Sequence, residues 1–406
     1  MLRAQTAGPS AVVPDSTLTV SLLTCSPGQE VYELYGHTAL RVRSSKTSTD
    51  VVFNYGVFSF DQPHFVWRFV LGQCDYLVAP CDFDLFMYEY RRRGSSVTEQ
   101  VLNLSEAEAN ALAHALIENC RPDKRTYRYN FLTNNCTTKA RDIIEANIDG
   151  EVLYPERAPR YTFRQLIHQF TVGHPWAQEG NDLLLGVDMD TLVTPRAEMF
   201  SPIYMMHYAD SAMISSFPNR YRPLVRQTKI LLAANAEAAA ADAARQPSFP
   251  LTPVQLGWVL LLLSVALVAW EQHRGRALWG FDVAWMLLQG LVGVLVSVML
   301  CWSTHPGVSS NWLFVVLNPL PLLALPLVVR SDIRGRECLY HRGAALVLTL
   351  FLVAVPFAKQ KFSALVVLLA LCLLSRAVSH LLLYRKVKSE RVKSERVKSE
   401  RVKSEK

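Results

Sequence analysis

Five apolar runs, separated by short polar segments, occupy most of the second half of the chain and constrain its fold more than any other feature. A helix of roughly 20 apolar residues is long enough to cross a bilayer. The runs therefore predict five membrane-spanning helices, at residues 254–270, 278–302, 312–329, 344–358 and 364–384. The first half instead mixes charged residues, Pro, Tyr and His as a globular domain does. The two halves need different solvents, water for the first and lipid for the second.

Basic residues in the loops predict how these helices are oriented. Arg274 and Arg276 follow the first run and a group of arginines follows the third, whereas residues 303–311 contain none. Loops rich in Lys and Arg stay in the cytoplasm. An odd number of spans then puts the N-terminal domain in the periplasm and the C-terminus in the cytoplasm of a bacterial inner membrane. Lys359 and Lys361 are the exception.

The net charge of +7 is explained by this topology, because much of the excess lies in the short loops and in the C-terminal tail. It therefore does not indicate a nucleic-acid partner. The tail repeats Arg-Val-Lys-Ser-Glu with a period of five residues, which matches no helical heptad. Dense charge of this kind is typical of a solvated, disordered segment.

Composition predicts five parts along the chain. Residues 1–17 are expected to be a leader remnant or disordered, since they lack the apolar core of a signal sequence. Residues 18–228 form the periplasmic domain, and 229–250 form an Ala-rich helical linker. The spans occupy 251–384, and residues 385–406 are the charged cytoplasmic tail.

The cysteines predict no metal site. A periplasmic location permits disulfides among Cys25, Cys74, Cys81 and Cys120, of which Cys74 and Cys81 are the nearest in sequence. Their spacing lacks the Cys/His clustering of zinc sites. Disulfides or buried thiols are therefore expected.

A histidine near the N-terminus lies at the start of a predicted hairpin. Residues 38–43 alternate in polarity as a strand does, and residues 51–58 form a second strand after a polar turn. The hairpin places Asp50 or Asn54 beside His37. Either side chain can hold an imidazole in one tautomer, as the third member of a catalytic triad does.

About a hundred residues later, Cys136 follows two good helix-capping residues, Asn134 and Asn135. Apolar residues then recur every three to four positions, which predicts a helix with Cys136 in its first turn. A helix N-terminus lowers the pKa of a thiol and can bind an oxyanion. Together, Cys136 and His37 fit a nucleophile and its base. A disulfide-bonded cysteine and a packed histidine fit these residues as well, so the pattern alone leaves both interpretations open.

Several longer motifs carry a family resemblance. They are Tyr35-Gly36-His37-Thr38-Ala39-Leu40-Arg41-Val42, Asp50, Phe53-Asn54-Tyr55-Gly56, Arg128-Tyr129-Asn130-Phe131 and Asn135-Cys136-Thr137-Thr138-Lys139-Ala140-Arg141-Asp142. On these residues, the segment 18–226 resembles the N-terminal periplasmic domain of the Lnb family, which are lipoprotein N-acyltransferases. The second half is similar to the membrane domain of that family, including His305-Pro306, Asn311-Trp312 and Asn318-Pro319-Leu320.

The resemblance implies a fold and a reaction. The His-before-Cys order is similar to circularly permuted papain-like folds of the NlpC and lecithin:retinol acyltransferase type. The expected fold class is therefore an α+β permuted papain/NlpC-like periplasmic domain fused to an all-α bundle of five transmembrane helices. The implied reaction moves a fatty acyl chain from a membrane phospholipid, through an acyl-cysteine thioester, to the α-amine of a diacylated lipoprotein. No cofactor or metal is required.

The resemblance also implies site residues. Cys136 is expected to be the nucleophile, His37 the general base and Asn54 the third member, with Asp50 as the alternative. Lipid or substrate contacts are expected from His305, Asn311, Asn318, Tyr35 and Arg141. For the first three of these, helix capping and loop hydrogen bonding are an equally simple explanation.

Two other functions remain open on the sequence. One is an NlpC-like cysteine hydrolase acting on peptidoglycan peptides, and the other is a non-catalytic membrane scaffold in which Cys136 is paired.

Two further groups of residues have structural explanations. Asp282, Arg376 and His380 lie near predicted span ends, where a charged head can reach the membrane surface. An aromatic group is expected to be core or an interfacial belt: Phe58, Phe60, Phe65, Trp67 and Phe69.

Overall fold

The computed structural model describes residues 18–58, 63–216, 220–246 and 249–404. Residues 1–17, predicted to be a leader remnant, and Phe60 lie outside the described residues. The chain divides into two compact units. The first holds the N-terminal part to Val172, residues 191–248 and the short segment Thr304–Pro306. The second holds residues 173–190 and the rest of the C-terminal half.

A seven-stranded sheet organises the first unit, in the order β10-β5-β1-β2-β3-β4-β6. Its neighbouring strands pair antiparallel. The strands are β1 (Leu18–Cys25), β2 (His37–Ser44), β3 (Asp50–Val57), β4 (Asp75–Asp82), β5 (Val97–Leu102), β6 (Thr126–Arg128) and β10 (Val225–Leu232). A smaller sheet joins β7 (Glu151–Leu153), β8 (Met213–Ser216) and β9 (Arg220–Pro223).

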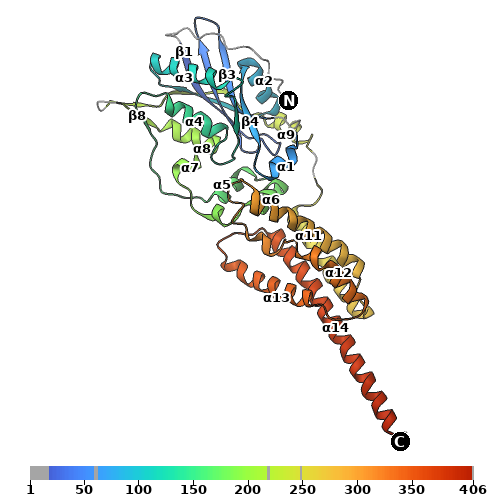
Figure 1. Cartoon of the computed structure of the whole chain (residues 1–406). Helices are drawn as coiled ribbons and strands as arrows, with labels where there is room; N and C mark the ends of the chain where they lie inside the picture. The colour runs from blue at the N-terminus through green and yellow to red at the C-terminus, as the bar shows by residue number, and fades with distance from the viewer. Residues whose placement is uncertain (1–17, 59–62, 217–219, 247–248, 405–406) are drawn as a thin grey trace. The chain divides into compact units, whose positions relative to one another are not determined.

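Helices cover both faces of the large sheet (Figure 1). Since side chains alternate along a strand, the sheet supplies one apolar set to each face. Leu22, Leu40 and Phe53 pack with helices α3 (Glu106–Asn119), α4 (Cys136–Ala146) and α8 (Pro202–Asp210). The other set, Leu23, Ala39 and Val52, packs with α2 (Phe83–Arg93). The remaining helices of this unit are α1 (Phe65–Val70), α5 (Phe163–Phe170), α7 (Pro195–Glu198) and α9 (Ala236–Ala243).

The predicted hairpin is confirmed. β2 and β3 pair antiparallel, with Ala39 opposite Asn54 and Arg43 opposite Asp50. Helix α3 begins with a capping box, because the Ser105 hydroxyl accepts from the Glu108 N–H and the Glu108 side chain accepts from the Ser105 N–H.

The predicted linker boundary at residue 228 is wrong. The sheet continues through that point, because β10 runs to Leu232 and pairs with β5. Alanines favour a helix in the rest of the segment, and α9 follows with Asn235 as its N-cap. Residues 229–232 are therefore an edge strand of the first unit and not a spacer.

Helices make up the second unit, and five of its helical segments are long and apolar enough to cross a membrane. They are Pro253–Arg274 (α10), Trp279–Trp302 (α11), Trp312–Ile333 (η2, Trp312–Val315, and α12, Leu320–Ile333), Leu339–Phe357 (α13, Leu339–Ala354, and η3, Val355–Phe357) and Ala364–Arg401. The prediction of five spans is confirmed. This unit also contains α6 (Pro175–Leu184) and η1 (Val187–Asp190).

The tail prediction differs from the structure. Helix α14 (Ala364–Ser404) continues without a break from the last apolar run through the charged repeats (Figure 1). Lys, Arg and Glu are good helix formers, and acidic and basic residues four positions apart pair on a helix surface, as Arg396 and Glu400 do at 3.3 Å. The five-residue period therefore does not prevent helix formation.

The prediction for Asp282, Arg376 and His380 is also wrong. All three side chains are buried and bonded to one another instead of reaching a surface. An arginine can be buried at such a position because carboxylates from two other helices surround it.

Gly293 shows how closely the helices of the second unit pack. A Cβ at this position would overlap the backbone of Asn318, whereas a Cβ on Gly280, in the same helix α11, would meet nothing within 4 Å. We expect Gly293→Ala to destabilise the protein by about 1–3 kcal/mol through overpacking. Gly280→Ala should be neutral or slightly stabilising, because alanine favours a helix. Thermal unfolding of the full chain in detergent compares the two, and equal midpoints would contradict this packing.

Candidate functional site

His37 begins strand β2, directly after a turn that requires glycine. Gly36 has a φ of +75°, and a Cβ there would meet the Cys25 carbonyl oxygen. A glycine tolerates both conditions. Strand alternation then puts His37 on the same face as Ala39, and the imidazole remains partly exposed at the end of the strand.

Cys136 is the first residue of helix α4, as predicted. The Asn135 side chain accepts hydrogen bonds from the N–H groups of Thr137 and Thr138, both at 2.9 Å. The Thr138 hydroxyl accepts in return from the Asn135 N–H. The Asn135 amide nitrogen also donates to the carbonyls of Phe131 and Phe200. One buried side chain therefore fixes where the helix starts and where the thiol lies.

The structure brings the two predicted groups together, because the His37 imidazole and the Cys136 thiol lie close enough to shift each other's pKa. Burial raises the pKa of the Cys136 thiol, but the charge and hydrogen bond of His37, the Thr38 N–H and the Thr137 hydroxyl outweigh it, so the pKa is below its usual value. Burial lowers the pKa of His37, but Cys136 and Asn54 outweigh it, so that pKa is raised. Both directions favour a thiolate beside an imidazolium.

Asn54 holds the other side of the ring. Its Oδ1 lies 3.1 Å from His37 Nε2. The Asn54 amide nitrogen donates to the Cys81 sulfur at 3.0 Å, which leaves Oδ1 as the atom that faces the imidazole. The Nε2–H therefore donates to Asn54, and Nδ1 remains for the thiol. The register shift in β3 comes after Asn54, so strand alternation holds at this residue.

Asp50, the alternative third member, is not placed beside His37. Its carboxylate pairs with Arg41, with 2.6 Å between Arg41 Nε and Asp50 Oδ1. Arg41 also donates to Glu99 at 3.0 Å. Asp50 lies at the far end of the hairpin from His37 because it starts β3, which runs antiparallel to β2. It balances a buried guanidinium, and Asn54 alone faces the ring.

No disulfide competes for the sulfur. All eight cysteines are described, and all are free thiols, including the four for which disulfides or buried thiols were expected. Cys81 accepts from Asn54 instead, and Cys25 is fully buried.

Two residues near the sulfur, Gly56 and Tyr127, were given no role from the sequence, although Gly56 belongs to one of the motifs that carry the resemblance. Gly56 has a φ of +91°, and the point where its Cβ would lie is 3.7 Å from Cys136 Cβ and 4.0 Å from the Tyr127 hydroxyl. The missing side chain leaves room beside the sulfur. The Tyr127 hydroxyl is buried, and none of the described residues accepts its proton. Only the pairing of β6 with β4 brings Tyr127 to this place, so no local sequence pattern predicts it.

Aromatic rings extend from the site to an apolar surface of the same unit. Tyr129 stacks on Tyr76 at 4.1 Å, and Tyr76 stacks on Phe58 at 4.9 Å. Phe58 in turn stacks on Phe65, the first residue of helix α1. This helix buries none of its residues and exposes Val66, Trp67 and Phe69. The exposed members of the predicted aromatic group, Trp67 and Phe69, therefore fit an interfacial belt better than a protein core. Tyr35, a predicted contact residue, packs edge to face on Phe131 at 4.7 Å next to His37.

The other predicted contact residues have partners within the protein. Arg141 is buried and donates to Asp142 and to the Arg196 carbonyl. His305 Nε2 lies 2.6 Å from the Phe69 carbonyl. Asn318 accepts from the Leu320 N–H as a cap and donates to the Val315 carbonyl.

Asn311 is the most completely bonded of them. Its amide donates to the Leu183 carbonyl at 2.7 Å, and its oxygen accepts from the Leu313 N–H and from Gln360. These bonds fit the structural explanation, capping and loop hydrogen bonding. A lipid contact of His305, Asn311, Asn318, Tyr35 or Arg141 stays a prediction.

Comparison with known protein families agrees with the two units. Residues 10–169 match the family model described as the Lnb N-terminal periplasmic domain, and residues 244–387 match the Lnb transmembrane domain. No curated protein and no solved structure matches the chain.

The thiol pKa leads to a prediction about alkylation. Because the pKa of Cys136 is lowered, its reaction with iodoacetamide should reach half its maximal rate at a lower pH than an ordinary cysteine does. His37→Ala should move that midpoint to higher pH, since burial then dominates. Peptide mass spectrometry follows each cysteine separately across a pH series.

Cys81 is the internal control for this experiment. Burial raises the pKa of its thiol to about 11, so at neutral pH it should react at least roughly tenfold more slowly than Cys136. A Cys136 that titrates like an ordinary thiol, with no change in His37→Ala, would contradict the pairing.

Proposed function

The chain belongs to the Lnb family, and we propose that it is a lipoprotein N-acyltransferase in which Cys136 is the nucleophile and His37 the general base. The observation that carries the proposal is the pairing of these two side chains, in which His37 lowers the pKa of the thiol and Asn54 holds the ring. The chain is a multi-pass membrane protein with a periplasmic N-terminal domain, and a thiolate in that domain fits a reaction on lipids of the outer leaflet.

The first half-reaction forms a thioester. The Cys136 thiolate attacks the carbonyl carbon of a phospholipid ester, and the carbonyl oxygen becomes an oxyanion. The C–O bond to the glycerol then breaks. The departing oxygen takes the proton from the His37 imidazolium, which releases a lysophospholipid and leaves the acyl chain on the sulfur.

The second half-reaction passes the chain to the acceptor. The α-amine of a lipoprotein's diacylglyceryl-cysteine attacks the thioester carbonyl. His37, now neutral, takes the proton of the attacking amine, and the C–S bond breaks to regenerate the thiolate. The Asn54 oxygen serves both steps, because it keeps the His37 Nε2–H in place and Nδ1 directed at the sulfur.

Two donors near the sulfur fit an oxyanion site. The N–H groups of Thr137 and Thr138 are capped by Asn135, and the Lys139 N–H donates to the Asn135 carbonyl. Of the first N–H groups of helix α4, the Cys136 N–H is therefore the one that can donate to the substrate. The Tyr127 hydroxyl, whose proton no described residue accepts, is the second.

The surroundings of the thiol support a fatty acyl substrate over a peptidoglycan peptide. The rings of Phe58, Tyr76 and Tyr129 form an apolar series within the first unit. That series ends at α1, where Trp67 is 55% exposed and Val66 is 75% exposed. Trp and Phe of this kind suit a membrane interface, whereas a stem peptide needs polar and charged contacts.

The orientation of the spans is part of the proposal. Five crossings from a periplasmic domain put the C-terminus in the cytoplasm. The arginines after the first and third spans support this topology through the positive-inside rule.

Acyl-enzyme trapping tests the proposed function. With a phospholipid carrying a labelled acyl chain and no acceptor, we expect a hydroxylamine-sensitive label on Cys136. His37→Ala should slow its formation by roughly 10²–10⁴-fold, as loss of a general base does. Cys136→Ala should abolish it, and Cys301→Ala, which removes an exposed thiol of the second unit, should not.

Analysis of lipoprotein N-termini in cells completes this test. Cells in which the Cys136→Ala variant is the only source of this activity should accumulate diacylated lipoproteins. Unchanged N-acylation with altered muropeptides would favour the peptidoglycan hydrolase, and an absence of any label under turnover would favour the scaffold.

Removal of one hydroxyl tests the oxyanion site. Tyr127→Phe should lower the rate of thioester formation by about 10²-fold, as loss of one oxyanion donor does. Alkylation of Cys136 should be unchanged, because Tyr127 does not activate the thiol. Tyr55→Phe is the matched control, since that hydroxyl accepts from Asn119 at 2.9 Å. Equal rates in the two variants would remove Tyr127 from the mechanism.

A further inference from the structure

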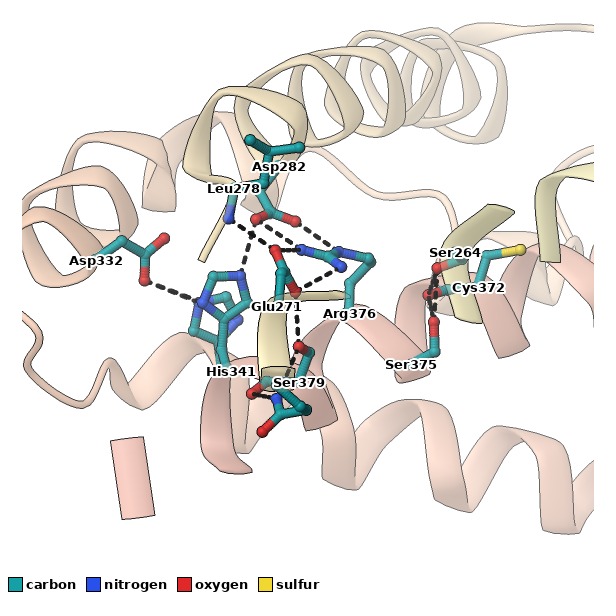
Figure 2. A network of polar contacts seen from close by, with 12 residues as sticks. Ser264, Glu271, Leu278, Asp282, Asp332, His341, Cys372, Ser375, Arg376 and Ser379 are labelled. Atoms are coloured by element: carbon teal, nitrogen blue, oxygen red, sulfur yellow. Dashed lines mark hydrogen bonds and ion pairs between the residues drawn. The ribbon is translucent and has the colours of Figure 1, made fainter. Parts of the chain in front are cut away.

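Six ionisable side chains meet inside the second unit, one or two from each of its five long helices (Figure 2). They come from the end of α10 (Glu271), the start of α11 (Asp282), the end of α12 (Asp332), the start of α13 (His341) and the middle of α14 (Arg376 and His380). The proposed acyl transfer uses none of them. Buried charges in a membrane protein are costly and often mark a function.

The arginine half of this cluster is fully bonded. Arg376 donates to both oxygens of Glu271, at 2.7 and 2.9 Å, and to both oxygens of Asp282, at 2.8 and 3.0 Å (Figure 2). Glu271 also accepts from the Ser379 hydroxyl and the Leu278 N–H. This half needs no further ligand.

The histidine half is not complete. His380 Nδ1 lies 3.1 Å from Asp332 Oδ1, and His341 Nε2 lies 4.0 Å from the same oxygen. His341 Nε2 and Asp332 Oδ2 are both buried, and neither has a hydrogen-bond partner among the residues that the structure describes. The side chain of His341 is only 8% exposed and that of Asp332 only 6%. Buried polar atoms without partners are uncommon, and a bound ion is one of the explanations for them.

Charge points in the same direction. Within the cluster, three carboxylates face one guanidinium, so two negative charges remain when both histidines are neutral. The two imidazole rings stack 4.1 Å apart and nearly parallel, at 4°. Two imidazolium ions in this arrangement would repel each other, whereas one divalent cation would balance both charges.

We propose that Asp332, His341 and His380 bind a divalent transition metal, and that Zn²⁺ matches their chemistry. One ligand atom from each lies within 4.8 Å of the others. Imidazole nitrogens with a carboxylate oxygen are a common zinc ligand set. Asp332 Oδ2 or a water completes the four-coordinate shell.

The neighbours of His380 fit a metal ligand. Its Nε2 lies 2.9 Å from Asp282 Oδ2, so the Nε2–H donates to that carboxylate and the Nδ1 lone pair faces Asp332. A ligating histidine usually donates its other N–H to a carboxylate in this way. Arg376 in turn fixes Asp282. The bound metal would join α12, α13 and α14, and through Arg376 it would connect to α10 and α11, as a structural zinc does.

Zinc binding to the purified full chain tests the site. After chelator treatment and removal of the chelator, the protein in detergent should take up one equivalent of added Zn²⁺, measured by elemental mass spectrometry, and its unfolding temperature should rise. Co²⁺ as a probe should show the absorption bands of a tetrahedral site with nitrogen and oxygen ligands.

Variants assign the ligands. His341→Ala and Asp332→Asn should each weaken Zn²⁺ binding by at least about 10²-fold, as loss of a ligand does. His273→Ala, which removes an exposed histidine at the end of α10, should bind as the parent chain does. His341→Gln keeps the size of the side chain in case the alanine variant does not fold.

Two results would overturn the proposal. One is an absence of Zn²⁺ uptake by the parent chain, which would mean that a proton on His380 balances the cluster. The other is uptake that His341→Gln and Asp332→Asn leave unchanged. Neither result bears on acyl-enzyme formation at Cys136, which is measured separately.

Discussion

The electrostatic pairing of the Cys136 thiol with the His37 imidazole is the interaction on which the candidate site depends. Neither group would be activated alone, because burial raises the pKa of a thiol and lowers that of a histidine. Each reverses the effect of burial on the other. The fold makes this possible because helix α4 and strand β2 both begin at the site, where Asn135 fixes the start of the helix and Gly36 the start of the strand.

Local sequence patterns were sufficient for much of the first unit. The hairpin and the helix that begins at Cys136 both rest on contacts between residues close in sequence. The choice between Asn54 and Asp50 could not be made locally, because it depends on Arg41 and Glu99 across the sheet. Tyr127 was missed for the same reason, since strand pairing alone brings it to the thiol.

In the second unit, the sequence predicted the number of spans but not the contacts between them. Length and apolar composition were enough to count the spans, since each helix satisfies its own backbone. They could not show that Asp282, Arg376 and His380 face inward, because this depends on which helices are neighbours. The helical tail was not predicted because dense charge and a five-residue period are typical of disorder, whereas Lys, Arg and Glu are also good helix formers.

The contact between Asn54 and Cys81 couples two positions that are 27 residues apart. The Asn54 carboxamide has a donor nitrogen and an acceptor oxygen. Because the nitrogen donates to the Cys81 sulfur on β4, the oxygen faces the His37 imidazole. A substitution at position 81 that offers a donor in place of sulfur would favour rotation of the amide, and the ring would then lose its acceptor. Homologous chains should therefore vary at these two positions together, keeping a hydrogen-bond acceptor at 81 wherever asparagine occupies 54.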